Sequence, residues 1–198
     1  MSNWNQRRTS IAAESDYDPL TSIPMLEAGY IDEAKARQRL THAFDIKNCK
    51  DITIIDPYLL ERDIGTILEL FSTQSERNIT VITFLNRVKN GEDKSPDKVT
   101  TATTIKNIVD DLTQKGIFAS FEVVVTDFEF HDRFFFCTDE DKDGLLVSSG
   151  GSLSMFLTKY SSLIRITNRT FRRTLLQFID RAKQNGKNLT DYIEEWSR

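Results

Sequence analysis

The chain has 198 residues, and its 26 Lys and Arg residues stand against 30 Asp and Glu residues, which gives a net charge of −4. This balance excludes a general attraction to nucleic acid or to anionic membranes, so any phosphate binding must come from a local cluster. The sequence has no run of about 18 apolar residues and no apolar signal segment at its start. We therefore expect a cytoplasmic protein with no membrane partner.

The amino-terminal part of the chain differs from the rest in composition. Residues 1–24 have scattered apolar positions and several Ser and Asp residues, so we predict a tail or arm. We predict one α/β domain for residues 25–198. It would begin with a helix over 31–44, which is acidic at its start and basic later, as the helix dipole favours.

The two cysteines, Cys49 and Cys137, are far apart in the sequence and form no Cys-x-x-Cys pair. This spacing makes a disulfide framework or a zinc site improbable, and we expect two small buried side chains. The Asp-rich segment 139–144 lacks the downstream glutamate of a calcium-binding loop. We therefore expect neither a metal nor a cofactor.

Three apolar, β-branched runs alternate with helix-period segments, which predicts parallel strands joined by crossover helices. The predicted strands are 51–58, 78–85 and 117–126, and the predicted helices are 59–75 and 100–114.

The first two of these strands end in polar residues. Asp56 and Arg87 follow their apolar runs directly, and open α/β sheets bind ligands at the carboxyl ends of their strands. Both are therefore candidates for binding a substrate. Two alternatives stay open, namely that Asp56 only caps the turn at Pro57 and that Arg87 is a solvated loop residue.

Residues 128–136 and 145–149 predict a hairpin of two buried strands. His131 and Arg133 would lie on the same face of its first strand, because they are two residues apart. A buried guanidinium needs a partner or a bound anion. Arginine fits a phosphate with two parallel hydrogen bonds, and a neighbouring histidine can act as a nucleophile.

A Gly150-Gly151-Ser152 turn leaves the second strand of this hairpin. Its backbone N–H groups and its hydroxyl suit the same anion. The alternative is an edge strand with its polar face in solvent and an ordinary Gly-Gly turn. A further strand over 161–167 and helices over 171–183 and 189–196 complete the chain.

His131-x-Arg133 followed by Gly151-Ser152-x-Ser154 resembles the His-x-Lys-x4-Asp-x6-Gly-Ser-x-Asn signature of the phospholipase D superfamily. It is more closely similar to divergent bacterial members of that family. The order of elements over residues 51–183 matches as well. The resemblance implies a phospholipase D-like α/β fold, with a mixed sheet, helices on both faces, and an N-terminal helix and extended tail.

The resemblance also implies roles for these residues in a hydrolase that needs no metal. His131 would attack phosphorus to give a phosphohistidine, Arg133 would hold the phosphate, and Ser152 would orient the phosphate or the histidine. Gly151 and Ser154 would contact the substrate. Because the chain has one copy of a motif that works in pairs, a homodimer is implied. Nucleic acid or a nucleotide is the expected phosphodiester substrate.

The sequence departs from the family pattern at three positions. Thr138 stands where the family has aspartate, Ser154 replaces its asparagine, and Arg133 replaces its lysine, with a different geometry of donors. These departures leave a second hypothesis open, a catalytically inactive binding or regulatory subunit of a bacterial or phage assembly. A third hypothesis places the function in protein–protein contacts through residues 1–24.

Overall fold

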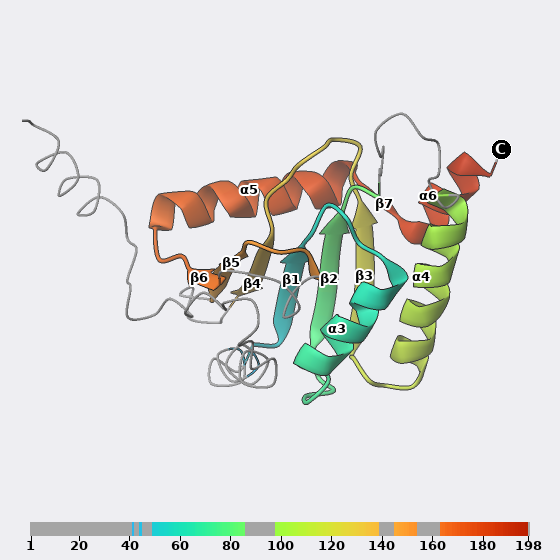
Figure 1. Cartoon of the computed structure of the whole chain (residues 1–198), viewed down its shortest axis with the longest axis horizontal. Coiled ribbons are helices and arrows are strands. Elements are labelled where there is room, and N and C mark those ends of the chain that lie inside the picture. Colours follow the sequence, from blue (N-terminus) through green and yellow to red (C-terminus); the bar gives the residue numbers. More distant parts are fainter. Residues whose placement is uncertain are drawn as a thin grey trace, which may run out of the picture.

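The computed structural model describes residues 49–85, 98–138, 145–153 and 163–197, together with Thr41 and Phe44. This part of the chain forms a seven-stranded mixed sheet in the order β6-β5-β4-β1-β2-β3-β7 (Figure 1). The predicted α/β class with a mixed sheet is confirmed.

The centre of the sheet consists of the three predicted parallel strands. β1 (Asp51–Ile55) pairs in parallel with β2 (Asn78–Thr83), and β2 pairs in parallel with β3 (Ser120–Val125). The connections are α3 (Glu61–Phe71) and α4 (Lys98–Gln114). The β-branched runs of these strands are largely buried because helices cover both faces of the sheet.

Antiparallel strands extend the sheet on both sides. β4 (Phe134–Thr138) pairs with β1, and β5 (Leu146–Ser149) and β6 (Leu163–Arg165) follow in antiparallel order. On the other side, the short β7 (Lys187–Asn188) pairs with β3. β7 could not be predicted from the sequence, because two polar residues carry no strand pattern.

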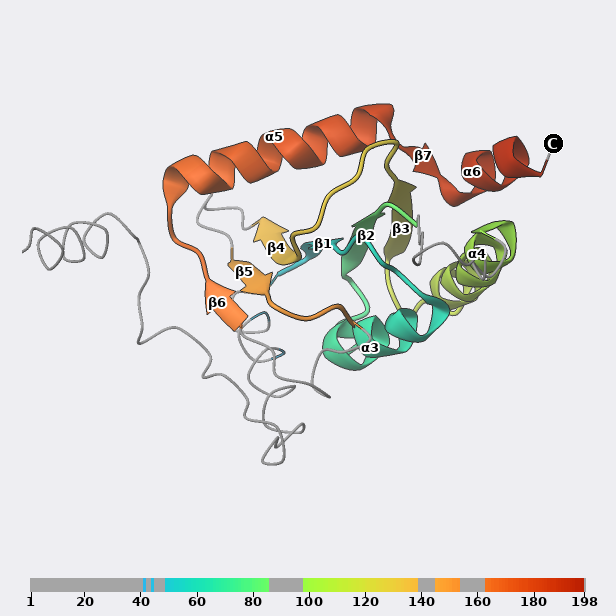
Figure 2. The ribbon, with the colours of Figure 1, turned by 45° about the horizontal axis from the view of Figure 1, so that its top comes forward.

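Helices cover both faces of the sheet, as predicted. Figure 2 shows α5 (Arg169–Asn185) along one face, with α3 and α4 against the other. The α5 face of the core contains Phe134, Phe136, Leu175 and Ile179, among others. α6 (Leu189–Trp196), whose bounds were predicted, packs beside α4. Asn side chains begin both carboxyl-terminal helices, because Asn168 and Asn188 accept hydrogen bonds from N–H groups in the first turns.

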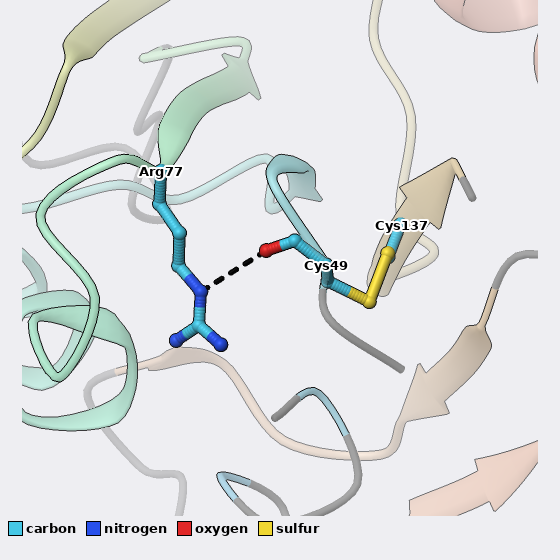
Figure 3. Close-up of a disulfide and its surroundings, with 3 residues drawn as sticks. All are labelled: Cys49, Arg77 and Cys137. Carbon is cyan, nitrogen blue, oxygen red and sulfur yellow. Dashed lines mark hydrogen bonds between the residues drawn. A yellow bond between two sulfur atoms is a disulfide. The ribbon is translucent and has the colours of Figure 1, made fainter. Parts of the chain in front are cut away.

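The expectation of two separate cysteines is wrong, because Cys49 and Cys137 form a disulfide (Figure 3). Both are buried, as predicted. Cys137 lies opposite Ile52 in the pairing of β4 with β1, and Cys49 comes just before β1. The two residues meet because β4 is the neighbour of β1, and their separation in the sequence does not reveal this.

A fully buried arginine lies beside the disulfide. Arg77 donates from Nε to the carbonyl oxygen of Cys49 at 3.1 Å (Figure 3). It also donates from Nη1 to the carbonyl oxygen of Phe71 at 3.2 Å. Phe71 is the last residue of α3, so the guanidinium also caps the negative end of that helix. Arg77 thus fastens α3 to the segment that leads into β1.

Several predictions fall outside the described residues. They are the tail over 1–24, the polar turn over 139–144, Arg87 and Ser154, and most of the helix over 31–44, of which Thr41 and Phe44 are described and helical. None of the helices in the described ranges is both long and apolar enough to cross a membrane.

Candidate active site at the carboxyl edge of the sheet

Three segments of the chain meet at the end of the sheet where the parallel strands have their carboxyl ends, the carboxyl edge of the sheet. β1 ends there at Ile55, β4 begins there because Phe134 lies opposite Ile55, and β5 ends there because Ser148 lies opposite Phe134. The residues that follow β1, precede β4 and follow β5 are therefore neighbours. They include Asp56, His131, Arg133, Gly151 and Ser152, and the structure thus brings these five predicted site residues together.

The prediction that His131 and Arg133 lie on a buried strand is wrong, because β4 begins only at Phe134. The pairing of β4 with β1 stops where β1 stops, at Ile55, so residues before Phe134 have no strand to pair with. Residues 126–133 instead run from β3 to β4, past the ends of β2 and β1 (Figure 1). The side chain of His131 is 72% exposed.

Side chains in this crossing segment still alternate between two directions. Phe128 and Phe130 turn toward α5, and both pack against Phe178 with ring centroids 5.6 and 5.3 Å away. Arg133 and His131 contact Tyr58 on the other side. The aromatic contacts with α5 thereby hold the segment that presents His131 and Arg133.

Asp56 connects the three segments of the edge. Its buried carboxylate accepts hydrogen bonds from the N–H of Tyr58 at 2.9 Å and from the N–H of Leu153 at 2.8 Å. Nε of Arg133 lies 3.5 Å from Oδ1 of Asp56, within ion-pair distance but without hydrogen-bond geometry. Asp56 therefore caps the turn at Pro57 and also fixes the segments that carry Arg133 and Ser152.

Tyr58 lies between the two residues of the predicted motif. Its ring is 5.3 Å from the guanidinium carbon of Arg133, and its hydroxyl forms a 3.2 Å hydrogen bond with Nδ1 of His131. The other ring nitrogen of His131, Nε2, is 3.8 Å from a carboxylate oxygen of Glu129. The imidazole is therefore held through Nδ1, while Nε2 faces the exposed carboxylate of Glu129.

The turn after β5 lies directly beside Arg133. The N–H of Ser149 donates to the carbonyl oxygen of Arg133 at 3.0 Å, and the hydroxyl of Ser149 donates to the carbonyl oxygen of Gly151 at 2.8 Å. Gly151 and Ser152 are both half-buried. The turn thus holds Gly151 and Ser152 at the same edge as the motif histidine and arginine.

The motif position occupied by Thr138 lies at the opposite edge of the sheet. Thr138 pairs with Asp51, the first residue of β1, and is five residues along the chain from Arg133. At about 3.4 Å per residue, this separation is about 17 Å. In the described ranges, no group of three His, Cys, Asp or Glu residues is placed to hold a metal ion.

Comparisons with known proteins give similarities of structure alone, since no protein-family model and no curated protein matches the sequence. The chain is similar to NucT from Helicobacter pylori, with a TM-score of 0.48, 11% identity, and coverage of 83% of this chain and 97% of that one. It is also similar to Nuc from Salmonella typhimurium, a phospholipase D family member, with a TM-score of 0.47, 11% identity, and coverage of 77% and 89%.

A third similarity is to TrmBL2, an archaeal chromatin protein, with a TM-score of 0.36 and 13% identity. It covers 91% of this chain, which spans 58% of the length of that protein. All three similarities concern the fold. The roles of the site residues depend on the geometry described above.

Tyr58 is the residue of this site that the sequence analysis missed. It was assigned only to the end of the first strand, although it follows Asp56 by two residues at the edge where ligands are expected. A tyrosine in that place has a hydroxyl that can reach a neighbouring polar group. Only the position of the crossing segment shows that this neighbour is His131.

Proposed function

We propose that the chain is a phosphodiesterase of the phospholipase D-like class, acting on nucleic acid or a nucleotide through a phosphohistidine at His131. The observation that carries this proposal is the connected series of Asp56, Arg133, Tyr58 and His131 at the carboxyl edge of the sheet. It places an exposed imidazole, held in orientation, beside a guanidinium and a Gly-Ser turn. These are the groups that in-line attack on a phosphodiester requires.

In the proposed reaction, Nε2 of His131 attacks phosphorus. The N–P bond forms while the P–O bond to the leaving group breaks, and the leaving oxygen takes up a proton from an acid. Water then attacks phosphorus and passes a proton to the conjugate base of that acid, while the N–P bond breaks, its electron pair returns to Nε2 and the phosphate monoester is released. Nε2 must carry a lone pair for the first step, so Nδ1 carries the proton and donates it to the hydroxyl of Tyr58.

Arg133 and the turn after β5 would hold the phosphate. Asp56 and Tyr58 fix the guanidinium from the Nε end and from its face, so its terminal N–H groups would bind the phosphate oxygens. Ser152 and the backbone of Gly151 would add donors. In this proposal Asp56 positions Arg133 and does not contact the substrate, since its carboxylate is buried.

The leaving group needs an acid, and the chain has only one other histidine, His42. We therefore include a homodimer in the proposal, in which His131 of a second copy supplies that proton. The pairing of Arg133 with Asp56 supports a second candidate function. A guanidinium whose charge is partly balanced stabilises the negative charge that develops in the transition state less strongly, which fits a subunit that binds a phosphodiester or a partner without turnover.

The test compares the full chain with His131→Ala and with the matched control His42→Ala, in EDTA. The substrates are single-stranded DNA, duplex DNA, RNA and a chromogenic phosphodiester. We expect His131→Ala to fall to the background rate and His42→Ala to keep full turnover. Acid-labile label from a radioactive phosphodiester should be trapped on the wild type and on His42→Ala, and not on His131→Ala.

Tyr58→Phe tests the orientation of the imidazole, because it keeps the ring under Arg133 and removes the hydroxyl. We expect a rate about fivefold lower with little change in KM, since one hydrogen bond contributes about 1 kcal/mol. Equal turnover in the wild type and His131→Ala would refute the catalytic assignment. Binding of the phosphodiester with no turnover in any variant would establish the second candidate.

A further inference from the structure

A cavity lies at the same edge of the sheet as the candidate active site, beside β3 and β7. It has a volume of about 290 Å³ and is lined by the residues after β2 and β3, by β7 and by α6. None of the described residues of the candidate active site lines it. Its volume is at the lower end of the range for sites that hold small molecules, about 300–1,000 Å³.

Aromatic side chains form much of this cavity. Tyr192 and Trp196 are one turn apart on α6, with ring centroids 6.1 Å apart and planes inclined at 36°, and Phe84 lines the cavity from the end of β2. Tyr192 is buried, whereas 56% of Trp196 is exposed. A cation is attracted to the faces of such rings.

Among the described residues that line the cavity, two carboxylates stand beside one ammonium group. Asp127 follows β3, and Glu195 of α6 forms an ion pair with Lys187 of β7. Asp191 and Glu194 add negative charge on α6 outside the cavity. Burial and the charge of Glu195 raise the pKa of Tyr192, so its phenol is neutral at physiological pH.

The aromatic rings and the carboxylates together indicate which class of ligand the cavity could bind. The excess of carboxylates disfavours phosphate and other anions. A bare metal ion would need several oxygen ligands around one point, and the described residues offer no such cluster. An organic cation satisfies both features, because aromatic faces accept its apolar surface while a carboxylate balances its charge.

We propose that this cavity, formed by Phe84, Asp127, Tyr192 and Trp196, binds a small organic cation of the trimethylammonium type. The cation lies against Tyr192 and Trp196, with Asp127 as its counter-ion. Lys187 holds Glu195, which leaves Asp127 as the carboxylate for the ligand. This binding site does not depend on the phosphodiesterase proposal.

The fluorescence of Trp196 can report binding of a ligand in the cavity that it lines. The chain has two tryptophans, so Trp4→Phe leaves Trp196 as the single source of tryptophan fluorescence in the otherwise complete protein. Choline chloride is titrated at constant ionic strength beside 3,3-dimethylbutanol, which has the same shape without the charge. We expect a saturable change with choline, and an affinity about tenfold lower for the neutral alcohol.

Matched variants in the same background separate the cavity from general electrostatics. Asp127→Asn and Glu194→Gln each remove one negative charge, but only Asp127 lines the cavity. We expect Asp127→Asn to weaken choline binding about tenfold and Glu194→Gln to change it less than about twofold. Thermal unfolding of each variant checks that α6 remains packed.

Three results would overturn the proposal: no saturable change with choline, equal affinity for choline and 3,3-dimethylbutanol, or equal weakening by the two variants. The second would show an apolar cavity with no preference for charge. The third would show that choline responds only to the acidic surroundings of α6.

Discussion

The Cys49–Cys137 disulfide gives a stability prediction whose size follows from the fold. The two residues are 88 positions apart, so the bond closes a long loop that contains β1, β2 and β3. In the chain-entropy description, closing a loop of this length in the unfolded state contributes about 4.6 kcal/mol at 25 °C. The free energy of unfolding of a whole domain is only about 5–15 kcal/mol.

We therefore expect reduction of the disulfide to lower the free energy of unfolding by about 4 kcal/mol. Urea unfolding of the oxidised and the reduced full chain, followed by circular dichroism, measures the difference. The slope with urea should increase on reduction, because the unfolded chain without the bond exposes more surface. Mass spectrometry should count no free thiol before reduction and two after it.

The control is Cys49→Ala/Cys137→Ala, which should resemble the reduced protein and should not respond to the reductant. Equal unfolding midpoints for the oxidised and the reduced wild type would refute the argument. So would two reactive thiols in the unfolded protein that has not been reduced, because the bond would then not exist.

Three further predictions concern other packed positions. Gly186→Ala should destabilise by about 2 kcal/mol in urea unfolding, because a Cβ there would meet the carbonyl oxygen of Ala182 and the side chain of Val124 at 2.5 Å; a neutral result would contradict the tight packing of α5 on β3. Arg77→Met should lower the free energy of unfolding by about 3 kcal/mol, because it leaves buried carbonyl groups without donors. Arg77→Lys should cost less, because its ammonium group can still donate to a carbonyl; equal losses for the two variants would contradict this and show that the retained charge gives no benefit. Because the pKa of Tyr192 is raised on folding, its contribution to stability is present below pH 10 and is lost as pH rises through the higher folded pKa. The urea midpoint of unfolding should therefore fall more between about pH 9 and about pH 11 for the wild type than for Tyr192→Phe.

The parallel half of the sheet was predictable because its strands are long apolar runs. β1, β2 and β3 are covered on both faces over their carboxyl-terminal halves, where most side chains are apolar and buried, and polar residues mark the strand ends. The helices between these strands were predictable because their apolar residues recur at helical spacing. Only the ends of these helices differ from the prediction. α3, for example, begins at Glu61, and the side chain of Asp63 in its first turn accepts a hydrogen bond from the N–H of Leu60.

The start of β4 could not be predicted from its own residues. The segment from Phe128 to Phe136 alternates aromatic and polar residues almost throughout, and this pattern is the same whether or not a partner strand lies beside it. Pairing stops where β1 turns away at Asp56. The disulfide was missed for a related reason, since the contact of Cys49 with Cys137 depends on β4 being next to β1.

The active-site prediction changed because two of its residues lie within ion-pair distance of each other. Asp56 was expected to contact a ligand and Arg133 to need an anion, and in the structure the carboxylate of Asp56 lies beside the guanidinium of Arg133. A buried carboxylate would otherwise be costly, and its pairing with Arg133 and two N–H groups removes that cost. In the proposed function, the group that would meet a ligand directly is then the exposed imidazole of His131. Substitution of Asp56 would therefore act on a ligand only through the placement of Arg133 and the turn that carries Ser152.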